Sequence, residues 1–223
     1  MCYKPYLENL LGGTDMSDFM SYDPWANCKT RNGYSGDIII SMLQKSIRRG
    51  EEKNALCAAY EMYITSPQFE EKLWRRLQII SVEDIGFGDP MAAVVVNTCN
   101  QMRKEFLYND GDRAMFFFHA IRYLCRCKKE RSGDHLKNMM AKEFQAGKLF
   151  EVPDYAYDMH TVEGRAMGRD EAHFLREGSR VVPEMETEET KAIKEQYLAF
   201  LEQWNEEESK AEVPPFHYNE WQY

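Results

Sequence analysis

Apolar residues recur with the period of an α-helix along most of this chain. The clearest stripe occupies positions i, i+4, i+8 and i+11 and consists of Phe69, Leu73, Leu77 and Ile80. Such spacing places the apolar side chains on one face of a helix, where a neighbouring element can bury them. Alternating apolar and polar positions, which indicate β-strands, are almost absent. The pattern therefore predicts an all-α helical bundle, with six helices joined by short turns between residues 36 and 147.

Glycine, proline and capping residues divide this helical region into its elements. Gly50 ends the first helix, and Ser66 with Pro67 has the sequence of a helix start, with serine as the cap and proline in the first turn. Gly86 and Gly88 end the helix that carries the stripe. Further helix starts are expected at Asp89–Pro90, the first of them running to Phe106, and at Asp112 and Ser132.

The chain divides by pattern into an irregular N-terminal arm, a helical domain, an irregular extension, and a long acidic C-terminal helix with its tail. The boundaries predicted for these four parts are residues 1–35, 36–147, 148–185 and 186–223. In the arm we expect one short helix around residues 5–11. In the extension, three glycines interrupt the pattern and a short helix is expected near residues 169–176.

Charge is unevenly distributed along the chain, whose formal net charge is −9. Residues 36–149 hold 18 Lys and Arg against 15 Asp and Glu, a net charge of +3, whereas residues 150–223 hold 7 against 18, a net charge of −11. The overall charge argues against a protein that coats nucleic acid. A mildly basic middle part is compatible with local nucleic-acid contact, although solvated helix faces and a solubilising tail are the simpler interpretation.

The sequence lacks the signatures of the common catalytic and cofactor sites. No Walker A loop or dinucleotide fingerprint is present, Cys125 and Cys127 lack the usual zinc spacing, and no serine or cysteine has the context of a catalytic nucleophile. We therefore expect no enzyme activity, no cofactor and no metal. The six cysteines form no disulfide framework, and no apolar run approaches the ~20 residues of a membrane span. A cytoplasmic protein without membrane contact is expected.

Cationic residues cluster on two of the predicted helices, at Lys45, Arg48 and Arg49 and at Lys72, Arg75 and Arg76. If these helices are neighbours, the cations form a patch suited to phosphates. An equally weighted alternative is that they pair with Glu83, Asp84 or acidic groups of another subunit. Glu83 and Asp84 are adjacent in the sequence, so on an α-helix they point to different faces, and we expect them to bond turn amides rather than act as a catalytic pair.

The histidines permit a different hypothesis. Asp158, His160 and His173 lie in the irregular extension and could form a small polar site, which leaves a small enzyme as an alternative function, although a structural hydrogen-bond network is the favoured interpretation. His119 lies in the apolar segment around Phe117 and is expected to be a core histidine.

Two segments resemble a known family. Ser41–Arg48 (SMLQKSIR) is similar to the SALxKSIRGSD segment of the replication-associated recombination protein A family, also called MgsA or Werner helicase-interacting protein. Leu73–Leu77 (LWRRL), followed by Ser81–Pro90 (SVEDIGFGDP), resembles the ARRLVRIASEDIGLADP segment of that family. His135–Asn138 is similar to its HLRN, and Tyr155–His160 is a weaker match. The resemblance covers residues 36–185, so the N-terminal arm and the acidic C-terminal helix have no counterpart in it.

The resemblance implies a fold and partners. Members of this family are AAA+ ATPases related to clamp loaders, and the similar part is their C-terminal oligomerisation domain, a helical bundle of the clamp-loader collar type. It implies a non-enzymatic module for DNA replication or repair that forms a homo-oligomer, a tetramer or dimer. DNA, a full-length AAA+ ATPase and single-strand-binding protein are candidate partners, and regulation of a full-length homologue by mixed assembly is an alternative.

Site residues follow from combining this resemblance with the charge pattern. The candidate DNA contacts are Lys45, Arg48, Arg49, Arg75 and Arg76. The segment that resembles SEDIGLADP would form a structural turn holding those cations in place, through Glu83, Asp84, Gly86, Gly88, Asp89 and Pro90.

Overall fold

The structure is a computed structural model that describes residues 24–203. The chain forms two compact units, divided between Lys148 and Leu149, and each is described by itself. The short helix expected at residues 5–11 lies outside the described residues. Among residues 24–203 no helix combines the length and apolar character needed to cross a bilayer.

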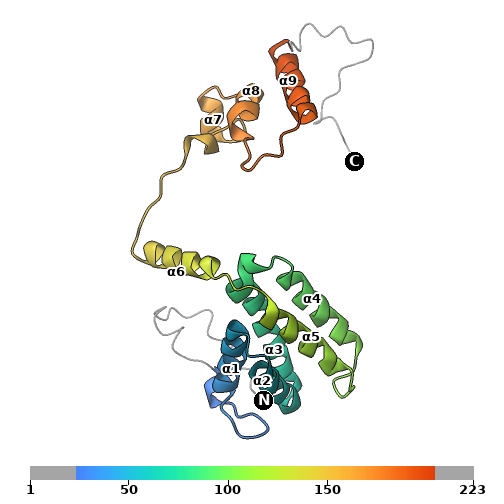
Figure 1. Ribbon diagram of the computed structural model, residues 1–223. Helices are drawn as coiled ribbons and strands as arrows, with labels where there is room; N and C mark the ends of the chain where they lie inside the picture. Colours follow the sequence, from blue (N-terminus) through green and yellow to red (C-terminus); the bar gives the residue numbers. More distant parts are fainter. Residues whose placement is uncertain (1–23, 204–223) are drawn as a thin grey trace, which may run out of the picture. The chain divides into compact units, whose positions relative to one another are not determined.

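The first unit consists of helices. Its main elements are α1 (Gly36–Arg49), α2 (Glu52–Thr65), α3 (Pro67–Ile80), α4 (Ala92–Met102), α5 (Arg113–Arg126) and α6 (Ser132–Gln145), with short 3₁₀ turns η1 (Pro24–Asn27) and η4 (Arg103–Glu105) (Figure 1). The described residues contain no β-strand, only an isolated bridge between Lys29 and Ser35. The prediction of an all-α fold is confirmed.

Local signals set several helix ends as expected. The Ser66 hydroxyl accepts a hydrogen bond of 3.3 Å from the Phe69 amide, and Pro67 opens α3. Gly50 follows α1 with φ at 74°, a left-handed conformation that glycine adopts without strain. The helix starts expected at Asp112 and Ser132 are confirmed, since α5 begins at Arg113 and α6 at Ser132. Neither side chain makes a capping hydrogen bond, and the Glu130 carboxylate instead accepts from the Ser132 amide at 2.7 Å.

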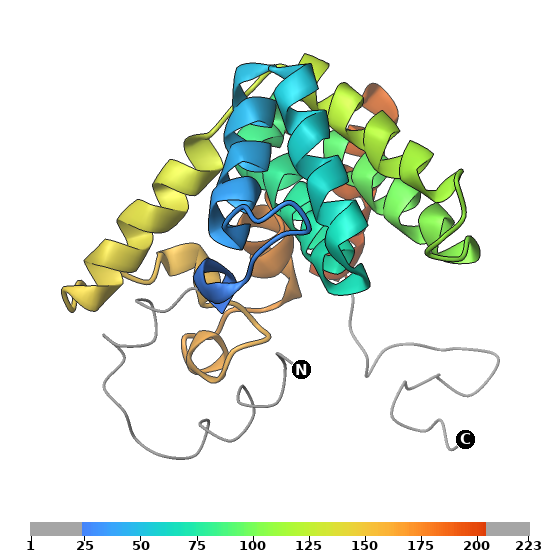
Figure 2. The same ribbon diagram turned by 90° about the horizontal axis from the view of Figure 1, so that it is seen from below.

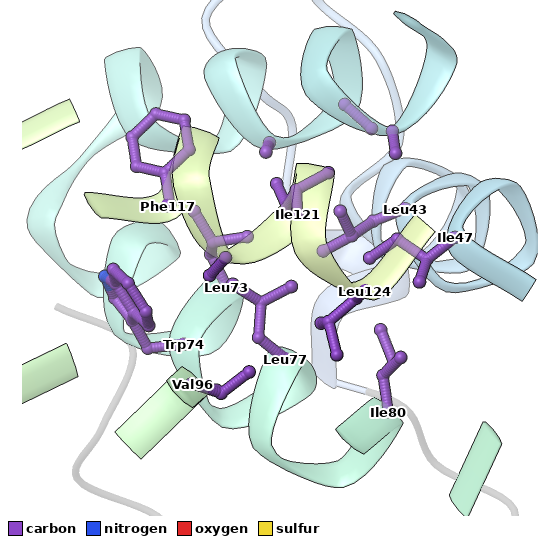
Figure 3. Packing of buried hydrophobic residues seen from close by; sticks show 14 of the residues in the cluster. Leu43, Ile47, Leu73, Trp74, Leu77, Ile80, Val96, Phe117, Ile121 and Leu124 are labelled. Atoms are coloured by element: carbon purple, nitrogen blue, oxygen red, sulfur yellow. The ribbon is translucent and has the colours of Figure 1, made fainter. Parts of the chain in front are cut away.

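The core of the first unit is built around α5, which contacts α1, α2, α3 and α4. Figure 3 shows Ile121 and Leu124 of α5 in one apolar cluster with Leu43 of α1 and Leu77 of α3, whereas the Phe117 ring points away from Leu73. The centroid of that ring lies 5.4 Å from the centroid of the Tyr63 ring on α2. The fully buried members of this cluster include Leu43, Ile47, Leu73, Leu77, Ile80, Phe117, Ile121 and Leu124. The predicted stripe on α3 is thus the face that the bundle buries.

A buried ion-pair network reinforces the packing of α3 against the segment after α4. The Glu70 carboxylate, 1% exposed, lies 3.2 Å from Nη1 of Arg103 and accepts a 2.9 Å hydrogen bond from Nε of Arg113. Arg103 forms the first residue of η4, and so the helix expected to reach Phe106 ends at Met102. Each buried charge has an opposite charge beside it, which a buried ion requires.

Helix α6 differs from the other helices of this unit because none of its residues is buried. In both views it extends away from α1–α5 (Figures 1 and 2). Its main attachment is at its N-terminal end, where it contacts the π-helical turn η2 (Ser81–Ile85) that follows α3.

The second unit contains short elements and one longer helix. In order they are η5 (Asp154–Ala156), α7 (Val162–Ala166), α8 (Glu171–His173), the π-helical turn η6 (Phe174–Gly178) and α9 (Glu188–Gln203). The short helix expected near residues 169–176 corresponds to α8 and the start of η6. The expected acidic helix is α9, which carries Ile193, Tyr197 and Phe200 on exposed positions.

Candidate nucleic-acid interface

The segment Ser81–Asp89 forms an unusual turn at the end of α3. Ser81–Ile85 is the π-helical turn η2, and the 3₁₀ turn η3 (Gly86–Gly88) follows it. Gly86 has φ at 52°, and a Cβ atom there would lie 2.5 Å from the Glu130 carbonyl oxygen. A Cβ atom on Gly88 would lie 2.4 Å from the Lys128 carbonyl oxygen. Both glycines are therefore needed because this turn packs directly against the backbone that leads into α6.

Asp84 is the centre of a polar cluster under this turn. Its side chain is fully buried, and its Oδ1 accepts a 2.6 Å hydrogen bond from Nε of Arg48. Nε of Arg131 forms an ion pair with the same oxygen at 3.0 Å, and Gln44 donates to Oδ2 at 3.0 Å. The Asp84 carbonyl also accepts from the Glu130 amide. One buried carboxylate thus joins α1, the turn after α3 and the start of α6.

Glu83 binds the same partners from a more exposed position. Its Oε1 lies 3.3 Å from Nη2 of Arg48 and 3.4 Å from Nη2 of Arg131, and it accepts from Gln44 at 3.1 Å. We expected Glu83 and Asp84 to diverge and to bond turn amides, and this was wrong. The reason lies in the arginines: Arg48 and Arg131 each bind Asp84 through Nε and Glu83 through Nη2, so one guanidinium group bridges both carboxylates.

The five candidate DNA contacts separate into two groups. Arg48 is held by the two carboxylates, and Arg76 donates to Oε1 of Gln44 at 3.1 Å. Lys45, Arg49 and Arg75 have exposed side chains. Because α1 packs against α3 and Gln44 connects the two, the helices that carry these cations are neighbours, as the patch requires.

Lys45 and Arg49 share one face of α1, four residues apart, and Nη1 of Arg49 donates to the Lys45 carbonyl at 3.0 Å. The network around Asp84 fixes the helix that carries them. Lys45 and Arg49 therefore hold exposed charges on a helix whose position is fixed by the buried network.

We expected a helix to start at Asp89–Pro90, but the Asp89 side chain instead connects the turn to α5. Its Oδ1 accepts from the Met91 amide at 3.0 Å, and its Oδ2 accepts from the Tyr123 hydroxyl at 2.7 Å. The hydrogen bond from Tyr123 holds the pKa of Asp89 below its usual value. The same bond, together with burial, raises the pKa of Tyr123 to about 12. Asp89 thus ties the turn to α5, and α4 begins only at Ala92.

The sequence reading missed a second cationic region, on α5. His119, Arg122 and Arg126 line a hollow of about 280 Å³ together with Asp89, Tyr123 and Cys127. Glu52 pairs with both arginines, at 2.6 Å and 3.4 Å. The expectation of a core histidine at position 119 was wrong, since His119 is exposed. The i, i+3, i+7 spacing of these residues was the signal that could have revealed their common face.

In the second unit, the proposed polar triad is only partly assembled. Nδ1 of His160 lies 3.1 Å from Oδ2 of Asp158. The His160 ring packs edge-on against the Phe174 ring, with 4.9 Å between the ring centroids. The hydrogen bonds from His160 hold the pKa of Asp158 below its usual value. Nδ1 of His173 is buried and has no hydrogen-bond partner within the described part of the chain.

A cluster of three or more His, Cys, Asp or Glu side chains suited to a metal ion does not occur among residues 24–203. The Asp158–His160 pair also sits where the backbone is tightly packed: a Cβ on Gly164 would lie 1.9 Å from the Asp158 carbonyl oxygen. Hydrogen bonding that holds this turn accounts for the pair.

The sequence of this helical chain matches a known protein family. The family described as "MgsA AAA+ ATPase C terminal" matches residues 62–214 of the chain. The chain belongs to this family.

The MgsA C-terminal match begins inside α2 and includes the Ser81–Pro90 turn and α6. It also continues through α9, so the expectation that the acidic helix lies outside the family was wrong. Helix α1, which carries Lys45, Arg48 and Arg49, precedes the matched residues.

A relative within this family is replication-associated recombination protein A of Bacillus subtilis (strain 168). It is 28% identical over 131 residues, which make up 59% of this chain and 30% of the relative. The chain therefore spans less than a third of that protein's length. The matched part is the C-terminal, non-catalytic part of an AAA+ ATPase, in agreement with the absence of a Walker A loop from the 223 residues.

Proposed function

We propose that this chain is a non-enzymatic interaction module in DNA replication or repair, which self-associates and contacts the phosphate backbone of DNA. The observation that supports DNA contact is that Lys45 and Arg49 on α1 and Arg75 on α3 are exposed cations of two neighbouring helices, which the Gln44–Arg76 hydrogen bond joins. Arg48 and Arg76 hold the two helices in place, because their guanidinium groups bind Glu83, Asp84 and Gln44.

Phosphate contacts of this kind have a measurable signature. Three cations that neutralise three phosphates release condensed counterions, so the logarithm of the binding constant for duplex DNA should fall with the logarithm of salt concentration with a slope of about −3. Binding should show little dependence on base sequence, because contacts to phosphates carry no sequence information.

The test is fluorescence anisotropy with a labelled forked DNA between about 50 and 200 mM salt. The double variant Arg49→Glu/Arg75→Glu should lose most of the affinity and flatten the slope. Lys104→Glu is the matched control, since Lys104 is an exposed cation of the same unit on η4. Equal binding by the double variant and the control would remove the α1–α3 surface as the DNA contact.

Mixed assembly with a full-length AAA+ relative is a second candidate function. The match covers only 30% of the B. subtilis relative, so this chain shares one part of that protein and not the rest of its length. A shared part of this kind could assemble with the same part of a full-length relative. Co-expression of the chain with a tagged full-length relative tests it. Recovery of both in one complex would support mixed assembly, and separate elution at micromolar concentrations would count against it.

A further inference from the structure

The outer edge of the Asp84 cluster contains a position that suits an oxyanion, and Glu83 fills it. Three side-chain N–H groups converge on Oε1 of Glu83: Nη2 of Arg48 at 3.3 Å, Nη2 of Arg131 at 3.4 Å and Nε2 of Gln44 at 3.1 Å. Guanidinium groups that converge on one position are the donors with which proteins bind carboxylates and phosphates. The carboxylate of this chain therefore occupies a site that a phosphate oxygen could also use.

Glu83 fills this site loosely. Charge-assisted N–H···O bonds are usually about 2.7–2.9 Å long, so all three contacts of Glu83 are long for a charged acceptor. Asp84, by contrast, lies 2.6 Å from Nε of Arg48 and 3.0 Å from Nε of Arg131. The Asp84 side chain is fully buried, whereas that of Glu83 is 24% exposed. Glu83 can thus turn toward water while Asp84 keeps both guanidinium groups in position.

The charges of the cluster fit the exchange of one anion for another. Its three cations and three anions are Arg48, Arg76, Arg131, Glu83, Asp84 and Asp134. Asp134 lies 2.6 Å from Nη2 of Arg131, the shortest contact of that guanidinium group. When Glu83 turns away, one positive charge is left without a counter-ion. A phosphodiester group, which carries one negative charge, restores the balance.

We propose that this position is a phosphate-binding subsite of the α1 surface and that Glu83 is an internal competitor, which a phosphate group displaces. The inference rests on the proposed DNA contact and names a further contact of it. Lys45 lies three residues before Arg48 on α1, so both cations can face one strand. Separate phosphate oxygens can each accept from one guanidinium group, whereas Oε1 of Glu83 is shared by three donors.

Neutralising the competitor provides the test. Glu83→Gln removes the charge and keeps the length of the side chain. With the labelled forked DNA, this variant should bind at least about fivefold more tightly than the unaltered chain, and its salt slope should be steeper by about 1, because one further phosphate is neutralised. Glu105→Gln is the matched control, since it removes an equal charge from an exposed glutamate of the same unit on η4. The control should bind within about twofold of the unaltered chain with the same slope.

Inorganic phosphate distinguishes a free anion from the DNA backbone as the source of the phosphate. Thermal unfolding is followed in sodium phosphate and in sodium chloride of equal ionic strength. A ligand that binds only the folded chain raises its Tm, so phosphate should raise the Tm of Glu83→Gln more than that of Glu105→Gln.

The outcomes separate this subsite from the DNA contact itself. Tighter DNA binding with the steeper slope supports a subsite that takes the DNA backbone. A larger phosphate-induced rise in Tm without that gain supports a subsite for free phosphate, and if no variant binds DNA, the proposed DNA contact is refuted. If DNA binding depends on Arg49 and Arg75 but Glu83→Gln matches Glu105→Gln in both measurements, the DNA contact stands and the subsite is overturned.

Discussion

Replacing Asp84 by alanine should destabilise the first unit more than any other single change in the polar cluster. The substitution removes a fully buried carboxylate from the contacts with Arg48 at 2.6 Å, with Arg131 at 3.0 Å and with Gln44 at 3.0 Å. Both arginines then keep their charge without their closest counter-ion. Breaking one side of a buried ion pair costs about 3–5 kcal/mol.

The lower end of that range applies here. The side chains of Arg48 and Arg131 are 29% exposed and can turn partly toward water, and Glu83 remains beside both. We therefore expect a loss of about 3 kcal/mol in the free energy of unfolding, which corresponds to a fall of about 10 °C in Tm for a unit of this size.

The assay is urea unfolding followed by circular dichroism, with the change read from the midpoint at constant m-value. Glu83→Ala is the matched control. Glu83 contacts the same arginines at 3.3 Å and 3.4 Å but is 24% exposed, so its removal should cost under about 1 kcal/mol. A cycle that combines Asp84→Ala with Arg48→Ala should give a coupling of at least about 1 kcal/mol. Equal losses for Asp84→Ala and Glu83→Ala, or strict additivity in the cycle, would refute this account of the turn.

Further predictions concern the same turn and the core. Gly86→Ala should lower the free energy of unfolding by more than about 2 kcal/mol, because φ is positive there and the added Cβ would clash with the Glu130 carbonyl oxygen. Gly133 has open space around it, so Gly133→Ala should change the free energy of unfolding by less than about 1 kcal/mol in the same urea assay. Tyr123 should ionise near pH 12 when its titration is followed by ultraviolet absorbance, and Asp89→Asn should bring the pKa of Tyr123 down toward the usual 10. Because the pKa of Tyr123 is higher in the folded than in the unfolded chain, the stability from this bond is complete below pH 10 and is lost as the pH rises through 12. Leu77→Ala should cost about 3–4 kcal/mol in urea unfolding, since the side chain is fully buried.

The sequence was a good guide to the helices of the first unit. The stripe from Phe69 to Ile80 is buried along its length. Ser66 caps the start of α3 through its hydroxyl, and Gly50 ends α1 in a left-handed conformation, as expected. These features depend on residues within a few positions of one another, which is why periodicity and capping rules could reveal them.

The candidate site was less predictable because its contacts join distant positions. Arg131 was not among the predicted residues, yet it lies beside Asp84 at 3.0 Å from 47 residues away. The choice between DNA contact and internal pairing for the cations was open in the sequence, and the structure divides them: Arg48 and Arg76 have internal partners, while Lys45 and Arg49 are exposed.

Sequence alone determined that this protein is built from α-helices, where most of them begin and end, and which of their faces are apolar. Tertiary structure alone decided which apolar side chains are buried: the α3 stripe lies in the core, whereas Leu136 and Met140 of α6 have helical spacing but are exposed. It also decided that Glu83 and Asp84 act together. A helical period records the chemistry of one element, whereas burial and ion pairing depend on which elements meet it in space.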